Sequence, residues 1–314
     1  MWAADRADIA TNNMKLANLT YTVNKIRKHP LTRDHKWNAL KRYLKWQVGS
    51  RLVPGKVAVD WIKPSKLLLA PGMWGSTMNL YVGLQDFEQM AFFLHLLRPE
   101  SLFVDAGANV GIYTILSSAV VGARSIAIEP VPTTYTNLLD NLRVNAIADK
   151  VTPLNVGLAE NKGTLQFSSR DDTRNRVLVG GHANGTSIQV PVMSLDDVLD
   201  GKEPTAIKMD VEGYETAVFA GATKALANKS LLALVVELNG HGAAYGYDES
   251  LLRRRLVEAG FQACRYDPLQ RQLRSSDSDR EPTGNTIYIR KTQENEIADR
   301  LRQAPRFALW DISL

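Results

Sequence analysis

From residue 101 onward, short apolar runs alternate with longer segments of helical spacing, and this alternation constrains the fold more than any other feature. Strands that alternate with helices indicate a parallel sheet with helices on both faces. Near-continuous apolar strands support this, because they are typical of strands buried on both sides. The sequence therefore predicts a doubly wound, Rossmann-like α/β fold, with strands expected at 101–107, 125–130, 151–160, 205–213 and 231–239.

Helices are expected between these strands, and smaller elements on either side of them. Thr133 or Thr134 is placed to cap the helix over 132–147. The other expected helices cover 32–47, 86–99, 110–123, 195–200, 214–228 and 248–261. Short strands and turns are expected over 53–84, and a hairpin around the polar segment 169–187. Two closing strands are expected at 263–267 and 285–291, separated by the polar loop 268–283, and one of them is expected to be antiparallel.

The length and charge of the chain predict one large domain with an extension. We expect a basic N-terminal extension of helices and short strands at 1–84, a main domain at 85–291 and a helical C-terminal tail at 292–314. Residues 1–56 hold 12 Lys and Arg against 3 Asp, whereas the remainder holds 26 against 30 acidic residues. The basic segment is either solvated helix surface or a contact for an anionic substrate, a phospholipid surface or nucleic acid.

Composition bears on the cellular compartment. Cys264 is the only cysteine, so an internal disulfide framework is excluded and a reducing compartment is expected. No stretch approaches the roughly 20 apolar residues of a membrane helix, and the N-terminus lacks the apolar core of an export signal. These features predict a cytoplasmic protein.

The first expected strand ends in the turn Asp105-Ala-Gly107-Ala-Asn109-Val-Gly111. In an open parallel sheet the ligand binds beyond the carboxyl ends of the strands, and this first turn contacts it. The two glycines let the backbone bend and let a ligand approach without a Cβ in the way. Glu129 closes the next strand, where an acidic side chain can accept hydrogen bonds from the two ribose hydroxyls of a nucleoside.

The spacing of this turn is DxGxNxG rather than the GxGxxG of dinucleotide-binding proteins. A leading carboxylate would repel a pyrophosphate but suits a cationic ligand. S-adenosylmethionine carries a sulfonium, an amine and a ribose, so the turn and Glu129 together predict this cofactor. An ordinary tight turn, with Glu129 as an acid before the helix, stays open as the alternative.

Five stretches of the chain resemble the FkbM-type methyltransferases. They are FVDAGANVGIYT, AIEPVPTTYTNLLDNLRVN, VPVMSLDDVL, AIKMDVEGYETAVFAGA and ALVVELN, and the resemblance covers roughly residues 85–290. DVEGYE, at 210–215, is the most specific element. The resemblance implies a class I methyltransferase fold, S-adenosylmethionine as methyl donor, and a hydroxyl of a sugar, glycoconjugate or natural product as acceptor.

Three residues are candidates for the chemistry, because an alcohol that is methylated must lose its proton to a base. Asp210 ends the fourth expected strand; its alternative is a structural anchor for the sulfonium end of the cofactor. Glu237 is a carboxylate in an apolar strand, where burial without a partner or ligand is costly. His241 lies in a glycine-rich loop and carries an imidazole, a side chain that can act as a base near neutral pH; its alternative is an exposed loop histidine. Glu212 is expected to reach the cleft or cap the next helix, and Lys208 is not expected there.

Further residues are expected around the cofactor. Tyr113 and Thr114, which begin the helix after the turn, are placed to touch its methionine portion. Asn155 and Val156 are placed to line the adenine pocket, and Pro130 follows Glu129. Two weaker hypotheses assign Glu88 to the amine of the cofactor and the arginines of the loop 169–187 to the acceptor, namely Arg170, Arg174 and Arg176.

No metal is expected, because the histidines are scattered and cysteine ligands are missing; a Mg²⁺ held by Asp210 and Glu237 is a minor alternative. Nucleic acid is not expected as a substrate, since residues 209–213 read MDVEG in place of the Asn/Asp-Pro-Pro-aromatic motif of amino-methylating relatives. The expected partner is a small, glycan-linked or lipid-linked acceptor, with peripheral membrane contact and a homo-oligomer left open. A non-catalytic S-adenosylmethionine-binding module and methylation of a nitrogen or carboxylate are the alternative functions.

Overall fold

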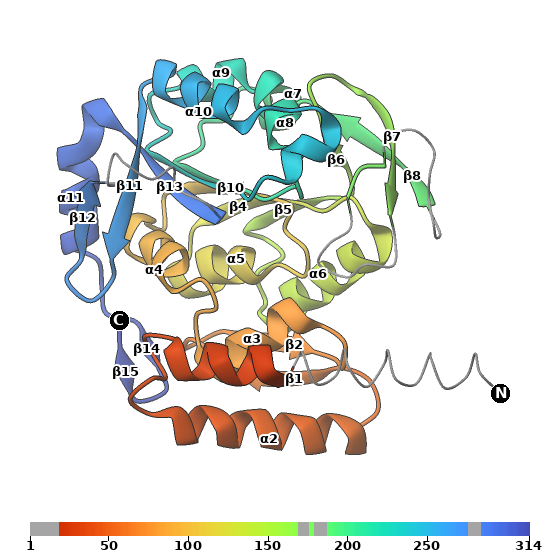
Figure 1. Cartoon of the computed structure of the whole chain (residues 1–314), viewed down its shortest axis with the longest axis vertical. Coiled ribbons are helices and arrows are strands. Elements are labelled where there is room, and N and C mark those ends of the chain that lie inside the picture. The colour runs from red at the N-terminus through yellow and green to blue at the C-terminus, as the bar shows by residue number, and fades with distance from the viewer. Residues whose placement is uncertain (1–18, 169–175, 179–186, 276–283) are drawn as a thin grey trace.

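The computed structural model describes residues 19–168, 176–178, 187–275 and 284–314, and Figure 1 shows a central sheet between two layers of helices. The sheet has eight strands in the order β12-β11-β13-β10-β9-β3-β4-β5. Its strands are β3 (Leu102–Ala106), β4 (Arg124–Ile128), β5 (Val151–Leu154), β9 (Ala206–Met209), β10 (Ala233–Leu238), β11 (Phe261–Asp267), β12 (Gln272–Ser275) and β13 (Gly284–Arg290).

The strand pairing confirms the predicted doubly wound fold. Neighbours from β10 to β5 run parallel, whereas β13 runs antiparallel to both β10 and β11. The predicted hairpin is also present: β7 (Gly163–Ser168) pairs antiparallel with β8 (Ser187–Met193), which pairs with β6 (Gly157–Leu158) in a small separate sheet. β12 is an additional strand in the segment expected to be a loop, paired with β11.

Each face of the large sheet is covered because its strands are apolar on both sides. In β10, Ala233 and Val235 pack in one apolar cluster, and Leu234, Val236 and Leu238 pack in another. The first cluster includes side chains from α4 (Phe87–Leu96), α5 (Ile112–Ile115) and its continuation η1 (Leu116–Val121). The second includes side chains from α7 (Leu195–Leu199), α8 (Glu215–Ala220), α9 (Thr223–Ala227) and α10 (Glu249–Glu258). α6 (Pro132–Val144) packs in a third.

Three predicted elements differ from the observed ones. The helix expected over 110–123 changes from α-helical to π-helical at Leu116. The helix expected over 214–228 is divided into α8 and α9 at Gly221, where a Cβ would lie 2.5 Å from the carbonyl oxygen of Glu160. Part of the segment expected as strands and turns is the helix α3 (Trp74–Val82).

The N-terminal segment packs against the core instead of projecting from it. It contains a helix over 19–28, then α2 (Lys36–Leu52), the hairpin of β1 (Val57–Asp60) and β2 (Lys66–Leu69), and α3. Side chains from these elements belong to the same apolar cluster as α4. The C-terminal tail contains the expected helix, α11 (Glu294–Arg302), and then a hairpin of β14 (Ala308–Leu309) and β15 (Ile312–Ser313). The boundaries at 84 and 291 remain predictions, and no helix among the described residues has both the length and the apolar character to cross a bilayer.

Asn141 of α6 joins the N-terminal segment to the glycine turn. Its side chain accepts a hydrogen bond from Leu68 N at 2.9 Å and donates one to Val110 O at 2.9 Å. Asn141→Ala is expected to lower the free energy of unfolding by about 2–4 kcal/mol, because it leaves two backbone groups without their partners. Urea denaturation measures this, with Asn137→Ala on the same helix as control. Equal effects of the two substitutions would contradict the role given to Asn141.

Candidate active site

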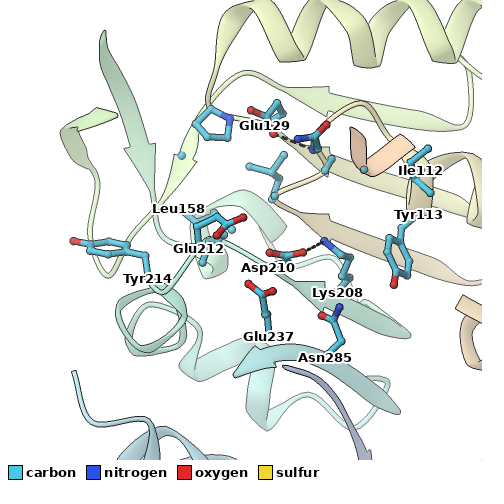
Figure 2. Close-up of a pocket in the computed structure, with 18 of the residues that line it drawn as sticks. Ile112, Tyr113, Glu129, Leu158, Lys208, Asp210, Glu212, Tyr214, Glu237 and Asn285 are labelled. Atoms are coloured by element: carbon cyan, nitrogen blue, oxygen red, sulfur yellow. Dashed lines mark hydrogen bonds and ion pairs between the residues drawn. The ribbon is translucent and has the colours of Figure 1, made fainter. Parts of the chain in front are cut away.

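A cavity of about 320 Å³ opens beyond the carboxyl ends of the parallel strands (Figure 2). The strand order reverses here, because β4 lies on one side of β3 and β9 on the other. Such a switch point is where α/β sheets bind their ligands. Of the sequence-predicted residues the cavity wall includes Gly107, Asn109, Tyr113, Glu129, Pro130, Val156, Asp210, Glu212 and Glu237.

The turn after β3 lets two backbone segments come together. Gly107 has φ +76°, and a Cβ there would lie 1.8 Å from the carbonyl oxygen of Asp210. Asn109 also has a positive φ, 50°, and its side chain accepts a hydrogen bond from Val110 N at 2.7 Å. Glycine is therefore required at 107 by the close approach of the β9 strand end as well as by its φ angle.

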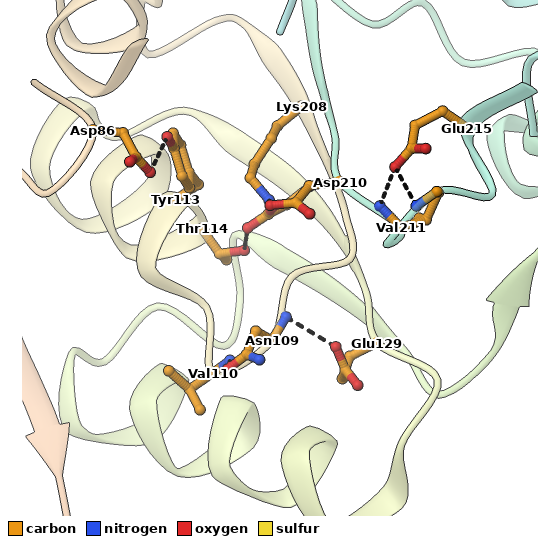
Figure 3. Close-up of polar contacts among 12 residues, drawn as sticks. Asp86, Asn109, Val110, Tyr113, Thr114, Glu129, Lys208, Asp210, Val211 and Glu215 are labelled. Atoms are coloured by element: carbon orange, nitrogen blue, oxygen red, sulfur yellow. Dashed lines mark hydrogen bonds and ion pairs between the residues drawn. The ribbon is translucent and has the colours of Figure 1, made fainter. Parts of the chain in front are cut away.

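Glu129 lies at the end of β4 and is fixed by backbone amides (Figure 3). Its Oε2 accepts a hydrogen bond from Asn109 N at 2.9 Å, and its Oε1 accepts one from Val131 N at 3.0 Å. Burial raises the pKa of Glu129 to about 7, against these hydrogen bonds, which lower it. A carboxylate has about four acceptor positions, so Glu129 can still accept hydrogen bonds from a ligand in the cavity.

Four residues expected at the cofactor support the wall instead of forming it. Asp105 is 1% exposed and accepts a hydrogen bond from Thr114 Oγ1 at 2.7 Å, so both side chains lie beneath the turn. Burial raises the pKa of Asp105. Gly111 packs against Leu138 of α6. Asn155 donates hydrogen bonds to the carbonyl oxygens of Glu129 and Pro130 at 2.8 and 3.0 Å, which fixes the end of β4. The structure places these four outside the cavity wall, and a direct contact of any of them with a ligand remains a prediction.

Lys208, which is buried, and Asp210, which is partly exposed, form an ion pair in the cavity wall. Lys208 Nζ donates a hydrogen bond to Asp210 Oδ2 at 2.9 Å and lies 5.1 Å from the centre of the Tyr113 ring. Burial opposes the charge of Lys208, but the carboxylates of Asp210 and Asp105 outweigh burial and raise its pKa. The prediction that Lys208 stays out of the cleft is wrong, because it shares a face of β9 with Asp210 and its ammonium group extends to that carboxylate.

Glu237, at the end of β10, faces the same part of the cavity (Figure 2). Its Oε2 is buried and has no hydrogen-bond partner among the described residues. Burial raises the pKa of Glu237 to about 9, and the neighbouring carboxylates of Asp210, Glu212 and Glu215 add to this. A carboxyl group with a raised pKa binds a proton more tightly, so the unprotonated form of Glu237 is suited to act as a base.

The DVEGYE segment shapes the backbone between β9 and α8. Glu215 accepts hydrogen bonds from Val211 N at 2.9 Å and Gly213 N at 3.3 Å (Figure 3). Gly213 has φ +94°, and a Cβ there would lie 2.7 Å from the backbone of His241. The segment thus holds the β9 end against η3 (His241–Tyr245).

His241 is not part of the cavity wall described above. Its side chain is 55% exposed, and its Nδ1 lies 3.6 Å from Glu212 Oε2. Glu212, Glu237 and His241 nevertheless each offer one potential metal-ligand atom, and these atoms lie within 4.8 Å of one another. Sequence spacing did not indicate this group because Glu212 follows β9, whereas Glu237 lies at the end of β10 and His241 follows that strand. The absence of a metal stays a prediction.

Several cavity residues were missed by the sequence reasoning. Asp86 lies just before α4 and accepts a hydrogen bond from Tyr113 Oη at 3.1 Å (Figure 3); burial raises its pKa. Asn285 of β13 and Gln85 each have a buried side-chain oxygen without a partner among the described residues. The N-terminal helix α3 contributes the wall residues Gly75, Ser76 and Asn79. The polar start of an apolar helix is a sequence signal for Asp86; none points to the others.

The structure also bears on the two weaker hypotheses, because Glu88 and Arg176 lie outside the cavity wall. Glu88 forms an ion pair with Arg265 at 2.7 Å and accepts a hydrogen bond from Tyr266 N at 2.7 Å, so it does not line the cavity and its assignment to the amine is corrected. Arg170 and Arg174 lie outside the described residues, and Arg176 is exposed.

The strand order, with one antiparallel strand inserted beside β10, and a nucleoside-sized cavity at the switch point define a class I methyltransferase fold. Residues 105–263 match the Methyltransferase FkbM domain family. The chain belongs to this family.

One curated protein and several solved structures are similar to this chain. Hexuronic acid methyltransferase AglP from Haloferax volcanii is 30% identical over 167 residues, which cover 52% of this chain and 64% of AglP. The match thus spans less than two thirds of that relative. Among solved structures, P. horikoshii TYW2 in complex with MeSAdo has 12% identity and a TM-score of 0.39, covering 74% of this chain and 69% of that one. An rRNA methylase from Streptococcus thermophilus has 15% identity and a TM-score of 0.36, covering 64% and 91%.

Proposed function

We propose that this chain transfers a methyl group from S-adenosylmethionine to a hydroxyl oxygen of a sugar or glycoconjugate. The observation that carries the proposal is that one cavity holds two acids, one placed to accept hydrogen bonds from a ribose and the other with a buried carboxyl oxygen that has no partner among the described residues. Glu129 supplies the first and Glu237 the second. The resemblance of the chain to a hexuronic acid methyltransferase supports a sugar acceptor.

The residues present fit the cofactor. A Cβ at position 107 would fill the space between the glycine turn and the carbonyl oxygen of Asp210. In the cavity wall, the side-chain oxygens of Gln85 and Asn285 have no hydrogen-bond partner among the described residues, so a ligand could supply one. Glu129 would accept hydrogen bonds from the ribose, with Pro130 and Val156 against the base. Asp86 and Asp210 would face the amine and the sulfonium. When bound, the cofactor supplies an electrophilic methyl group.

Glu237 is the proton acceptor in this proposal. As the acceptor oxygen gains the methyl group, the hydroxyl proton passes to Glu237 in its unprotonated form, and a pKa raised to about 9 makes that form a stronger base than an ordinary carboxylate. Asp210 is held by Lys208 at 2.9 Å and is therefore less suited to take the proton. Its charge instead keeps the pKa of Glu237 raised.

The charge of the cavity bears on the atom that is methylated. Five carboxyl groups line it, together with the single ammonium group of Lys208 among the described residues; they belong to Asp86, Glu129, Asp210, Glu212 and Glu237. An acidic lining attracts a sulfonium and repels a carboxylate acceptor, so we favour a neutral hydroxyl. Methylation of a carboxylate is the second candidate, because the hexuronic acid named for the relative carries both groups.

The test is a transfer assay with S-adenosylmethionine labelled in the methyl group and hexuronate glycosides as acceptors. We expect labelled product whose methyl group survives alkaline hydrolysis, as an ether does. Release of the label by alkali would show an ester and favour the second candidate. Cofactor binding without transfer to any sugar acceptor would favour a non-catalytic binding module.

Binding of S-adenosylmethionine is expected to weaken as the pH falls through about 7. Glu129 has a folded-state pKa of about 7, raised by burial, so below that pH it gains a proton and loses acceptor capacity toward the ribose. Calorimetric titrations across pH 5.5–8.5 measure the effect. The Glu129→Gln variant should bind weakly with a flat pH profile, and Glu88→Gln, outside the cavity, should keep the wild-type profile. A wild-type profile that is flat would contradict the role of Glu129.

A further inference from the structure

Helix α2 presents an apolar stripe to solvent. Of the eleven large apolar side chains that are exposed in the described residues, seven lie between residues 19 and 53. Trp37, Leu44, Val48 and Leu52 share one side of α2, because they follow one another at intervals of seven, four and four residues. Their exposed fractions are 68, 54, 61 and 76%. Such a row on a helix surface indicates an interaction site rather than scattered surface residues.

The same side of α2 is basic. Lys41, Lys45 and Arg51 are exposed beside the apolar stripe, and the helix contains no acidic residue. Arg27 and Lys28, at the end of the preceding helix, are exposed as well. A helix that combines Trp, Leu and Val with lysines and lacks acids is typical of helices that lie in the interface of an anionic bilayer.

The opposite side of α2 is held firmly. Arg42 donates hydrogen bonds to the carbonyl oxygen of Tyr81 at 3.3 and 2.9 Å and stacks on the Trp310 ring at 3.4 Å. Tyr43 packs edge-on against Tyr81, with ring centres 5.1 Å apart. Tyr81 belongs to α3, whose first turn lines the cavity. The exposed face is thus part of a rigid element that also builds the wall of the active site.

We propose that the outer face of α2 (Trp37, Lys41, Leu44, Lys45, Val48, Arg51 and Leu52) binds the headgroup region of an anionic lipid bilayer, so that the enzyme works at a membrane surface. A nucleic acid would contact the basic side chains of this face, but the exposed Trp, Leu and Val side chains would not contribute to its binding. At an anionic lipid interface, the basic side chains contact headgroups and the apolar side chains are buried among the lipids. The inference does not depend on the identity of the methyl acceptor.

The test is co-sedimentation of the full chain with vesicles of equal parts phosphatidylcholine and phosphatidylglycerol, with pure phosphatidylcholine vesicles alongside. We expect binding to the anionic vesicles that weakens as salt is raised. Lys41→Gln combined with Lys45→Gln should lower the partition coefficient about thirtyfold, which corresponds to about 1 kcal/mol for each removed lysine. Leu44→Ser combined with Val48→Ser should lower it on the same vesicles while leaving the salt dependence in place.

Helix α10 supplies a matched control. It exposes Leu251 and Val257, with 52 and 60% exposed side chains, and Arg254, but it also contains Glu249 and Glu258. Figure 1 shows α10 and α2 at opposite edges of the molecule. Leu251→Ser combined with Val257→Ser and Arg254→Gln should bind vesicles as the wild type does, and thermal unfolding should be the same for all variants.

Four outcomes would overturn the proposal. One is a wild-type chain that stays in the supernatant with anionic vesicles, and another is equal loss of binding in the α2 and α10 variants. A third is a wild-type oligomer, seen by light scattering, that the α2 substitutions dissociate, since the face would then contact a second copy. The fourth is competition in which an RNA or DNA oligonucleotide binds more tightly than vesicles and depends on the same lysines.

Discussion

The Gly107→Ala variant is expected to lose binding of S-adenosylmethionine and to unfold at a free energy lower by about 2–5 kcal/mol. Two costs add: about 1–2 kcal/mol for a side chain in the left-handed region, and about 1–3 kcal/mol for displacing a packed neighbour. The neighbour is the carbonyl oxygen of Asp210, only 1.8 Å from the added Cβ. Because it must move by more than an ångström, turnover should fall about a hundredfold or more.

Gly201 offers a control with the same backbone angle. Its φ is also +76°, but a Cβ there would have no atom within 4 Å. Gly201→Ala should therefore show only the conformational cost, about 1–2 kcal/mol, with unchanged cofactor affinity. Urea denaturation and calorimetry on both variants separate the two costs. Similar effects at 107 and 201 would mean that the contact with Asp210 does not matter.

The Glu237→Gln variant is expected to retain cofactor binding and to lose turnover by about 10²–10⁴-fold, because the amide cannot accept the proton of a hydroxyl. The pH profile gives a second readout. Only the unprotonated form acts as the base, and the pKa of Glu237 is about 9, so the wild-type rate should rise with pH up to about 9 and then level off. Asp210→Asn, if it retains activity, should shift this rise to lower pH, since the charge of Asp210 helps to raise that pKa.

Glu160→Gln, an exposed carboxylate outside the cavity, is the control and should change neither rate nor profile. A Glu237→Gln enzyme with nearly wild-type turnover, or a rate that does not rise between pH 7 and 9, would exclude Glu237 as the base. Such a result would leave cofactor binding at Glu129 and Gly107 untouched and would favour a carboxylate acceptor, which needs no base.

The sheet could be predicted from the sequence because its strands are apolar, short and separated by helices. The same logic located Gly107, Glu129, Asp210 and Glu237, since the carboxyl ends of parallel strands meet at one edge. Their places in the cavity wall follow from topology alone.

The positions of other cavity residues depend on tertiary packing, which cannot be predicted from the local sequence pattern. Asp86 precedes α4, and Asn285 lies on β13. Both reach the cavity only because these elements pack beside β3 and β10. The sequence does not place Lys208 in the cleft, because the extension of its ammonium group to the Asp210 carboxylate is visible only in the structure. Asp105 was expected at the ligand, but its hydrogen bond to Thr114 holds it beneath the turn.

The sequence predicts that residues 1–84 form a basic extension, and charge is the only feature that indicates a function for this segment. The structure shows that α3 lines the cavity and that α2 packs on α3. Removal of the first 56 residues would therefore uncover part of the core and would not isolate an electrostatic role. Substitutions on the exposed side of α2 are the cleaner test, because they leave the buried contacts of Arg42 and Tyr43 in place.

A crystal structure of the chain with S-adenosylhomocysteine tests the central claim most directly. We predict that the ribose hydroxyls lie within hydrogen-bond distance of the Glu129 carboxylate and that the sulfur faces Asp210 and Glu237. A nucleoside bound elsewhere, or a cavity left empty at saturating ligand, would contradict the account.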